Sequence, residues 1–212
     1  MGLTGGEFVA EYLISEDVPY VFGIPGHGDM AAFDAFKDRE DRITMIAPRH
    51  EQAAAHMADA YYRASGKPLA TMTSIGPGSL NIATGLATAF IDSIPVISFT
   101  GGPQTYMLGR GVLQELERQQ DNVFPHILQP MVKRNWDVQH VDLLADVLPR
   151  AFNTALTGRP GPVHIELPMD VQAETTDLNL PDPQQRRPAF VKVRPDPDAV
   201  DAAAARLLSA KR

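Results

Sequence analysis

Cysteine is absent from this 212-residue sequence. Its absence excludes a disulfide framework, a thiolate zinc site and a thiol nucleophile together. A basic excess is also missing, because 19 Lys and Arg stand against 26 Asp and Glu and give a formal net charge of −7. A chain of that net sign does not attract nucleic acid or anionic membranes. We therefore expect small molecules or proteins as partners, with no nucleic acid and no membrane.

The amino terminus has no export signal, since Glu7 and Glu11 fall where a signal peptide needs a basic start and an apolar run. We therefore expect a cytoplasmic protein. Residues 68–91 are uncharged and could suggest a membrane span, but Gly76-Pro77-Gly78 and Asn81 interrupt them. We interpret this stretch as a buried strand, a loop and a buried helix.

Signature motifs of several protein classes are also missing. The sequence contains neither GxGxxG nor GxxxxGK[ST], which weakens the hypothesis of an unrelated nucleotide-binding α/β protein. No GxSxG elbow occurs, and no nucleophile–base set can be assembled from spacing. The spacing of His27, His50 and His56 fits no compact metal motif, so we expect this chain alone to form no metal site.

Strand-like and helix-like segments alternate along the chain. Thr4 and Glu7 predict a capping box at the first helix, and Asp29 is well placed to cap the second. This alternation predicts an α/β domain with parallel strands joined by helical crossovers. The expected strands are 20–24, 43–46, 69–74, 96–100 and 163–167, and the expected later helices are 29–36, 51–64, 79–91, 113–128, 142–156 and 199–210.

Composition changes near the end of the chain, where five prolines from Pro181 to Pro197 interrupt a polar stretch. We therefore divide the chain into a domain over residues 1–174, a Pro-rich linker over 175–195 and a further helix over 196–212. Asp196 or Asp198 would cap that helix.

Two turns and one carboxylate are the candidate functional features. The turns at 23–28 and 76–78 follow strands, so their backbone N–H groups could meet a ligand at the carboxyl edge of the sheet, or they could be ordinary tight turns. Glu51 begins the helix 51–64 and could serve the helix dipole alone. The Ala-rich residues 53–60 favour instead a buried Glu51, and a buried carboxylate needs a ligand or a proton.

Five ordered motifs resemble one enzyme family over roughly residues 3–174. Together they are similar to the N-terminal pyrimidine-binding domain of thiamine-diphosphate enzymes of the acetolactate synthase and decarboxylase family. The resemblance implies a doubly wound, mainly parallel sheet with helices on both faces, followed by a central domain whose first helix is 196–212. The motifs are Gly23-Ile-Pro-Gly26, Pro48-Arg-His-Glu51, Ala58-Asp-Ala-Tyr-Tyr-Arg-Ala-Ser-Gly-Lys-Pro68, Thr73-Ser-Ile-Gly-Pro-Gly-Ser-Leu-Asn81 and Gly158-Arg-Pro-Gly-Pro-Val-His-Ile-Glu-Leu-Pro168.

The resemblance implies that Glu51 is catalytic and binds the cofactor. It matches the family glutamate that hydrogen-bonds N1′ of the aminopyrimidine and promotes the tautomer whose N4′ nitrogen deprotonates thiazolium C2, an exchange that requires a dry pocket. Pro25 and Gly26 match the loop beside the pyrimidine, and Pro77 and Asn81 match residues that line the same ring. The implied activity is that of a thiamine-diphosphate-dependent lyase or transferase acting on a 2-keto acid or related carbonyl.

His27 and Gln114 match family positions that face the substrate. Acetolactate synthases usually have glycine in place of His27 and phenylalanine in place of Leu113. The Gly-His-Gly turn and residues 112–117 are similar to those of the inositol-pathway hydrolase that opens a cyclic dione, so that activity stays an alternative. A non-catalytic interaction or dimerisation module with the same fold is another alternative.

The family's diphosphate-binding motif, Gly-Asp-Gly followed by asparagine, is missing, because Met30 follows Gly28-Asp29. The resemblance therefore implies thiamine diphosphate and Mg²⁺ as cofactors, with the diphosphate and the metal held by a domain absent from this chain. We expect the chain alone to be inactive. Its implied partner is a second copy in a homodimer or tetramer, or a separate diphosphate-domain subunit.

Overall fold

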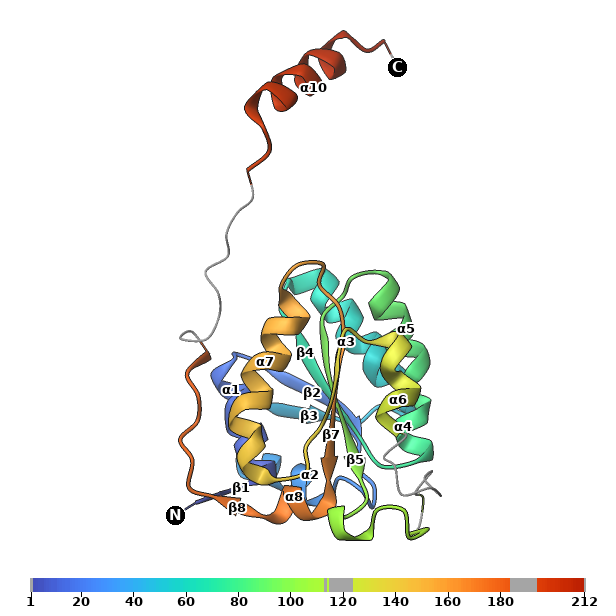
Figure 1. The fold of residues 1–212 in the computed structure, drawn as a ribbon, viewed down its shortest axis with the longest axis vertical. Coiled ribbons are helices and arrows are strands. Elements are labelled where there is room, and N and C mark those ends of the chain that lie inside the picture. Colours follow the sequence, from blue (N-terminus) through green and yellow to red (C-terminus); the bar gives the residue numbers. More distant parts are fainter. Residues whose placement is uncertain (1, 113, 115–123, 184–193, 212) are drawn as a thin grey trace.

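Six parallel strands form a sheet at the centre of this computed structural model, which describes residues 2–112, 114, 124–183 and 194–211 (Figure 1). The strand order is β3-β2-β4-β5-β7-β6, and every neighbouring pair is parallel. The sheet confirms the mainly parallel arrangement. Its strands are β2 (Tyr20–Ile24), β3 (Thr44–Ile46), β4 (Leu69–Thr73), β5 (Val96–Gly102), β6 (Asn135–Asp137) and β7 (Val163–Pro168).

Helices cover both faces of the sheet, as the doubly wound fold requires (Figure 1). One layer contains α1 (Gly5–Ser15), α2 (Met30–Lys37), α7 (Leu144–Leu156) and α8 (Met169–Ala173). The other contains α3 (Glu51–Ser65), α4 (Pro77–Asn81), α5 (Ala83–Ile91) and α6 (Phe124–Leu128). Smaller elements are an antiparallel pair, β1 (Leu3–Thr4) with β8 (Thr175–Thr176), and 3₁₀ turns at Thr105–Met107, Gln129–Met131 and Val141–Leu143.

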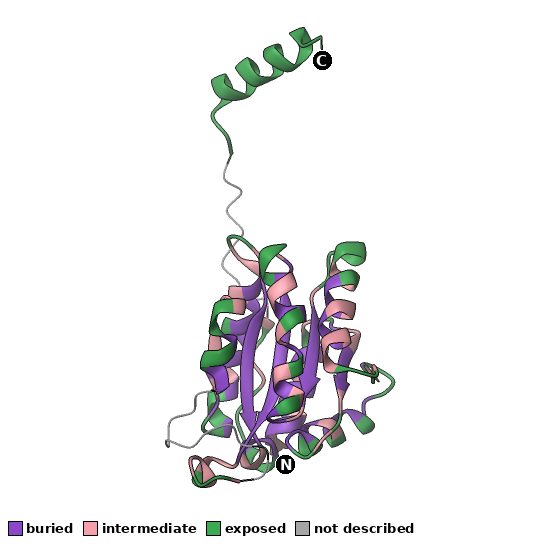
Figure 2. Cartoon of the chain, turned by 90° about the vertical axis from the view of Figure 1, so that its right-hand side faces the viewer, coloured by how far each residue is buried: buried purple, intermediate pink, exposed green. Residues whose placement is uncertain are grey.

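The core lies between the sheet and its two helical layers. Every residue of β4, β5 and β7 is buried, and Figure 2 shows these strands enclosed by helices whose outer sides are exposed. Strands covered on both faces consist of near-continuous apolar and small residues, which explains why the sequence pattern locates them. The predicted capping box at the start of α1 is confirmed. Glu7 Oε2 accepts from Thr4 N–H at 2.8 Å, and Thr4 Oγ1 accepts from Glu7 N–H at 3.2 Å.

Two predicted helices differ in the structure. The expected helix 79–91 is divided into α4 and α5 at Ile82, because the two parts have different anchors. Ser79 Oγ of α4 donates to the backbone of Ser74, whereas Gly85 of α5 packs directly against Ala55 of α3. Of the expected helix 113–128, α6 forms the last turn, and residues 113 and 115–123 lie outside the described residues.

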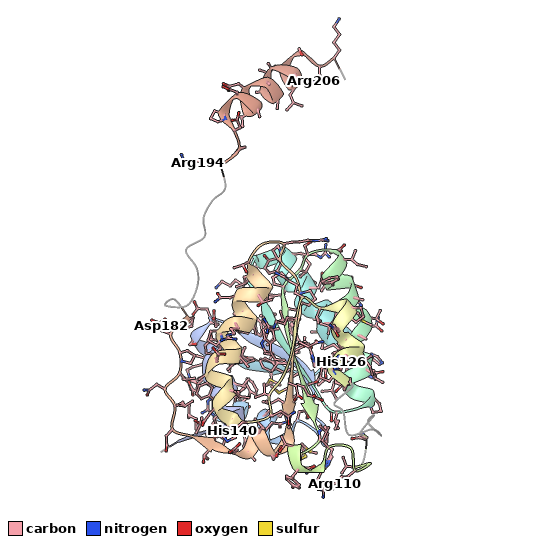
Figure 3. The ribbon with its side chains drawn as sticks, in the orientation of Figure 1. Arg110, His126, His140, Asp182, Arg194 and Arg206 are labelled. Carbon is pink, nitrogen blue, oxygen red and sulfur yellow. The ribbon has the colours of Figure 1, made fainter. Side chains whose placement is uncertain are left out.

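The separate helix α10 (Pro197–Ser209) has no buried residue, and Asp196 caps it through a 3.0 Å bond from the N–H of Ala199. Figure 3 shows Arg206 on this helix and Arg194 just before it, both away from the sheet. The Pro-rich residues 184–193 lie outside the described residues, so the three-part division of the chain stays a prediction. Among the described helices, none is both long and apolar enough to cross a lipid bilayer.

Two rows of polar side chains cross the middle of the sheet on one face. All six are at most 1% exposed. His164 Nε2 lies 2.8 Å from Thr100 Oγ1, and its Nδ1 has no hydrogen-bond partner among the described residues. Burial lowers the pKa of His164 to about 3, so the imidazole is neutral at neutral pH. The rows are Thr71, Ser98 and His164, then Thr73, Thr100 and Glu166.

The buried neutral His164 should make folding stability depend on pH. The unfolded histidine takes up a proton near pH 6.5 and the folded one only near pH 3, so stability is lost as the pH falls below 6.5. Between pH 7 and pH 5, wild type should lose about 2 kcal/mol more than His164→Gln, at about 1.36 kcal/mol per pH unit. Urea unfolding measures this difference. His126→Gln, at an exposed histidine of α6, is the control, and parallel pH curves for wild type and His164→Gln would contradict the prediction.

Candidate functional site

The chain reverses its direction of travel across the sheet between β2 and β4. From β2 it crosses to β3 on one side, and from β4 it crosses to β5 on the other side. Because β2 and β4 are adjacent and parallel, the turns after Ile24 and Thr73 lie at the same edge of the sheet. Such a switch point is where parallel α/β sheets bind their ligands.

A cavity of about 450 Å³ opens between these two turns, and we call it the Glu51 cavity. Its volume falls in the usual range for small-molecule sites. All seven residues singled out from the sequence are among those that line it, although they come from four separate segments of the chain. The lining residues are Ile24, Pro25, Gly26, His27, Glu51, Ser74, Ile75, Pro77, Gly78, Asn81 and Gln114.

The turn after β2 is held from several directions. Gly28 N–H donates to Ser74 Oγ at 3.0 Å, and Gly28 O accepts from Gln172 Nε2 of α8 at 2.7 Å. Gly26 N–H donates to Asp29 Oδ1 at 2.7 Å. Asp29 does occupy the predicted N-cap position of α2, but its side chain makes no capping hydrogen bond to the helix and bonds the turn instead. The turn is thus a fixed wall of the cavity.

The Asp29 carboxyl is completely buried behind that wall. Burial raises the pKa of Asp29 to about 7, and the negative charge of Glu51 adds to the rise. Neither Asp29 nor Gln172 was singled out as a site residue from the sequence. Gln172 is separated from Gly28 by 144 residues, so no local pattern could have linked them.

Glu51 lies on the first turn of α3, where His50 is the N-cap and its Nδ1 accepts from Gln52 N–H at 3.2 Å. Glu51 Oε2 accepts from Asn81 Nδ2 at 3.0 Å. The expectation of a deeply buried Glu51 is wrong for this chain, in which Glu51 is only half-buried. The small residues that pack closely are on another face of α3, at Ala54, Ala55 and Ala58, while Glu51 faces the open cavity.

The other predicted residues lie around the cavity mouth. Pro25, His27, Pro77, Asn81 and Gln114 are all exposed. Gln114 adopts a left-handed backbone with φ of 66°, and its carbonyl passes so close to Gly76 that a side chain at Gly76 would overlap it. The glycine therefore lets the segment at residue 114 approach the turn after β4.

The three histidines of interest do not converge. His27 lines the cavity, His50 caps α3, and His56 lies beside Gln52 with its Nε2 3.3 Å from Gln52 Nε2. Among the described residues, no group of three or more His, Asp or Glu side chains is arranged to hold a metal ion. The chemical character of the Glu51 cavity comes instead from one carboxylate between apolar and backbone walls.

Comparison with known protein families shows to which family this chain belongs. Residues 3–122 match a family described as "Thiamine pyrophosphate enzyme, N-terminal TPP binding domain". The chain belongs to this family. Thiamine pyrophosphate (TPP) is the same compound as thiamine diphosphate, so the resemblance to this family is confirmed.

Several relatives of this TPP-enzyme domain have related names. The "Probable acetolactate synthase large subunit" of Methanocaldococcus jannaschii is 39% identical over 176 residues, which is 83% of this chain and 28% of the relative. The "Acetolactate synthase catalytic subunit, mitochondrial" of Saccharomyces cerevisiae is 39% identical over 173 residues, 82% of this chain and 24% of the relative. The "Acetolactate synthase isozyme 1 large subunit" of Escherichia coli K12 is 34% identical over 212 residues, 99% of this chain and 36% of the relative.

The chain therefore spans about a quarter to a third of the length of these relatives. It belongs to the TPP-binding N-terminal domain family, and these relatives are named as acetolactate synthase subunits. The relatives do not assign roles to single residues of the Glu51 cavity, and those roles stay predictions.

The TPP-enzyme domain depends on close backbone contact behind its cavity. A side chain at Gly101 of β5 would overlap the carbonyl oxygen of Gly28, so Gly101→Ala should displace the turn and destabilise the domain by about 1–3 kcal/mol. Gly78→Ala is the matched control, because its Cβ would lie at an ordinary 3.4 Å from Glu51 Oε1 and Ser74 Cβ. Urea unfolding of both variants checks this, and equal stability would contradict it.

Proposed function

We propose that the Glu51 cavity binds the aminopyrimidine ring of thiamine diphosphate and that Glu51 exchanges a proton with a ring nitrogen. The observation that supports this most is the position of the Glu51 carboxylate, between the turns of two adjacent strands and hydrogen-bonded to Asn81. No Lys or Arg is present among the described residues that line the cavity, so the carboxylate is available to a ligand's own N–H groups. A carboxylate that faces a ring N–H makes a strong, charge-assisted hydrogen bond.

The shape and composition of the cavity fit such a ring. Pro25 and Ile24 on one turn, and Pro77 and Ile75 on the other, offer apolar contacts to a flat heterocycle. Gly26 and Gly78 have no side chains, so backbone and ring can approach each other. At Gly78 even a Cβ would lie 3.4 Å from Glu51 Oε1, which means that the backbone of α4 borders the carboxylate.

The residues of this chain then have separate roles in the proposal. Glu51 holds and transfers a proton at the ring nitrogen, Asn81 orients Glu51, and Pro25, Gly26 and Pro77 bind the ring. His27 and Gln114, exposed at the mouth, contact the substrate. The chemistry that thiamine diphosphate supplies when bound is nucleophilic attack on a carbonyl carbon and storage of the electrons that decarboxylation releases.

We also propose that the complete site needs parts that this chain does not contain. Glu51 is only half-buried here, whereas proton exchange at a ring nitrogen requires the exclusion of water. A diphosphate-binding domain that holds Mg²⁺, from a partner subunit, would cover the mouth and complete the pocket. The whole enzyme is then a thiamine-diphosphate-dependent, acetolactate synthase-like lyase or transferase that acts on a 2-keto acid as a homodimer or tetramer.

Replacing the carboxylate of Glu51 tests the proposal. In the enzyme assembled with its diphosphate-binding domain, Glu51→Gln should reduce turnover by about 10²–10⁴, the usual contribution of a positioned proton-transfer group. The fold should be unchanged, because the amide keeps the size of the side chain and can still bond Asn81. Asp198→Asn, in the exposed first turn of α10, is the control for loss of a first-turn carboxylate. Near-wild-type turnover of Glu51→Gln at saturating thiamine diphosphate would contradict the role.

His27→Ala and Gln114→Ala test the substrate side. Both residues are exposed at the mouth, and neither bonds Glu51 among the interactions of the described residues, so the variants should change substrate preference or product partition more than cofactor affinity. Steady-state kinetics on several 2-keto acids, beside calorimetric titration with thiamine diphosphate, separates the two effects. A tenfold loss of cofactor affinity with unchanged substrate kinetics would show that these residues belong to the cofactor site.

A further inference from the structure

A second carboxyl lies behind the wall of the Glu51 cavity and has an unsatisfied oxygen. Asp29 is 0% exposed. Its Oδ1 accepts from Gly26 N–H at 2.7 Å, and its Oδ2 has no hydrogen-bond partner among the described residues. A buried oxygen without a partner costs stability, so its presence calls for an explanation.

Different side chains bond different residues of the turn after β2. Ser74 and Gln172 both hold Gly28, through its N–H and its carbonyl. Gly26 N–H is bonded by Asp29. Gly26 lines the cavity and Gly28 is buried behind it, so Asp29 is the anchor that acts on the part of the turn nearest a ligand.

The electrostatic surroundings of Asp29 are unusual for an acid. Burial is the main cause that raises its pKa to about 7, and the hydrogen bond from Gly26 opposes the rise. Glu51, at the start of α3, is the charged group whose field raises that pKa further. His27, two residues earlier on the same turn, is the other titratable side chain at this wall. Burial, with a smaller contribution from Glu51, therefore brings the pKa of Asp29 close to neutral pH.

We propose that Asp29 is a positioning residue for the Glu51 cavity, whose buried carboxyl fixes Gly26 and thereby the wall against which the aminopyrimidine ring binds. The inference rests on the proposed function and adds a link between two acids. Negative charge on Glu51 opposes ionisation of Asp29, so a positively charged ring N–H that bonds Glu51, or a proton that the ring passes to Glu51, favours the ionised form of Asp29. The ionised carboxyl makes a stronger, charge-assisted bond to Gly26. Binding at Glu51 thus tightens the wall beside it.

Nuclear magnetic resonance on the full 212-residue chain tests the link directly. The Gly26 amide proton and the Asp29 carboxyl carbon should titrate together with a midpoint near pH 7. Glu51→Gln should lower that midpoint by about half a pH unit or more, because it removes the opposing charge. Asp29→Asn should abolish the Gly26 transition, and Asp34→Asn, at an exposed acid of the same helix, should leave it unchanged. An identical midpoint in wild type and Glu51→Gln would overturn the proposal.

Binding of a cofactor fragment, 4-amino-5-hydroxymethyl-2-methylpyrimidine, tests the positioning role. Asp29→Ala removes the acceptor for Gly26 and should weaken the fragment about tenfold, whereas Asp29→Asn keeps an acceptor oxygen and should remain within about threefold of wild type. The affinity of wild type for the fragment should also rise from pH 6 to pH 8, and it should rise by a larger factor than the affinity of Asp29→Asn. The variant serves as the control here, because the fragment's own ionisation affects both proteins equally. Wild-type affinity in Asp29→Ala would overturn the proposal.

Two further results separate this proposal from the one on which it rests. If wild type bound no fragment, the proposed function would fail, while the titration of Gly26 and Asp29 would still decide whether Asp29 holds the turn. If the fragment bound wild type, failed to bind Glu51→Gln and bound both Asp29 variants normally, the proposed function would stand and the role of Asp29 would be wrong. Should Asp29→Ala not fold, Asp29→Asn and the midpoint in Glu51→Gln decide the matter.

Discussion

The opposite crossovers from β2 and β4 are the constraint on which the rest of the structure depends. Two parallel strands that are neighbours in the sheet must end at the same edge, and because their helices leave toward opposite faces, the turns between them cannot be filled by either helix. The resulting gap is the Glu51 cavity. Glu51 itself enters from a third element, α3, whose first turn lies beside α4 and Asn81.

Hydrogen bonds and a close backbone contact at a glycine keep the Glu51 cavity in its shape. The turn after β2 is bonded by Ser74, Asp29 and Gln172, and the absence of a side chain at Gly101 lets β5 approach its carbonyl. Buried hydrogen bonds of this kind are costly when broken and leave few alternative arrangements. The cavity wall is therefore held from several directions, while the residues at its mouth are exposed.

Strands that are buried on both sides could be read from the sequence, because their apolar and small residues form runs between glycine and proline; β2 occupies the expected residues 20–24. The short strand β6, with the polar ends Asn135 and Asp137, lacks that pattern and was missed. The ordered motifs contain five of the predicted cavity residues, Pro25, Gly26, Glu51, Pro77 and Asn81, whereas His27 and Gln114 lie outside them. The exposure of Glu51 and the contact of Gln172 depend on tertiary packing across the chain, and no local periodicity encodes them.

A crystal structure of the 212-residue chain with the aminopyrimidine fragment bound would test the central claim most directly. The account predicts the ring between the Pro25–Gly26 turn and Pro77, with a ring nitrogen about 3 Å from the Glu51 carboxylate, a normal hydrogen-bond distance. A ring bound elsewhere, such as in the similar-sized cavity beside Lys133 and Arg134, would contradict it. So would a ring in the Glu51 cavity whose nitrogens do not contact Glu51.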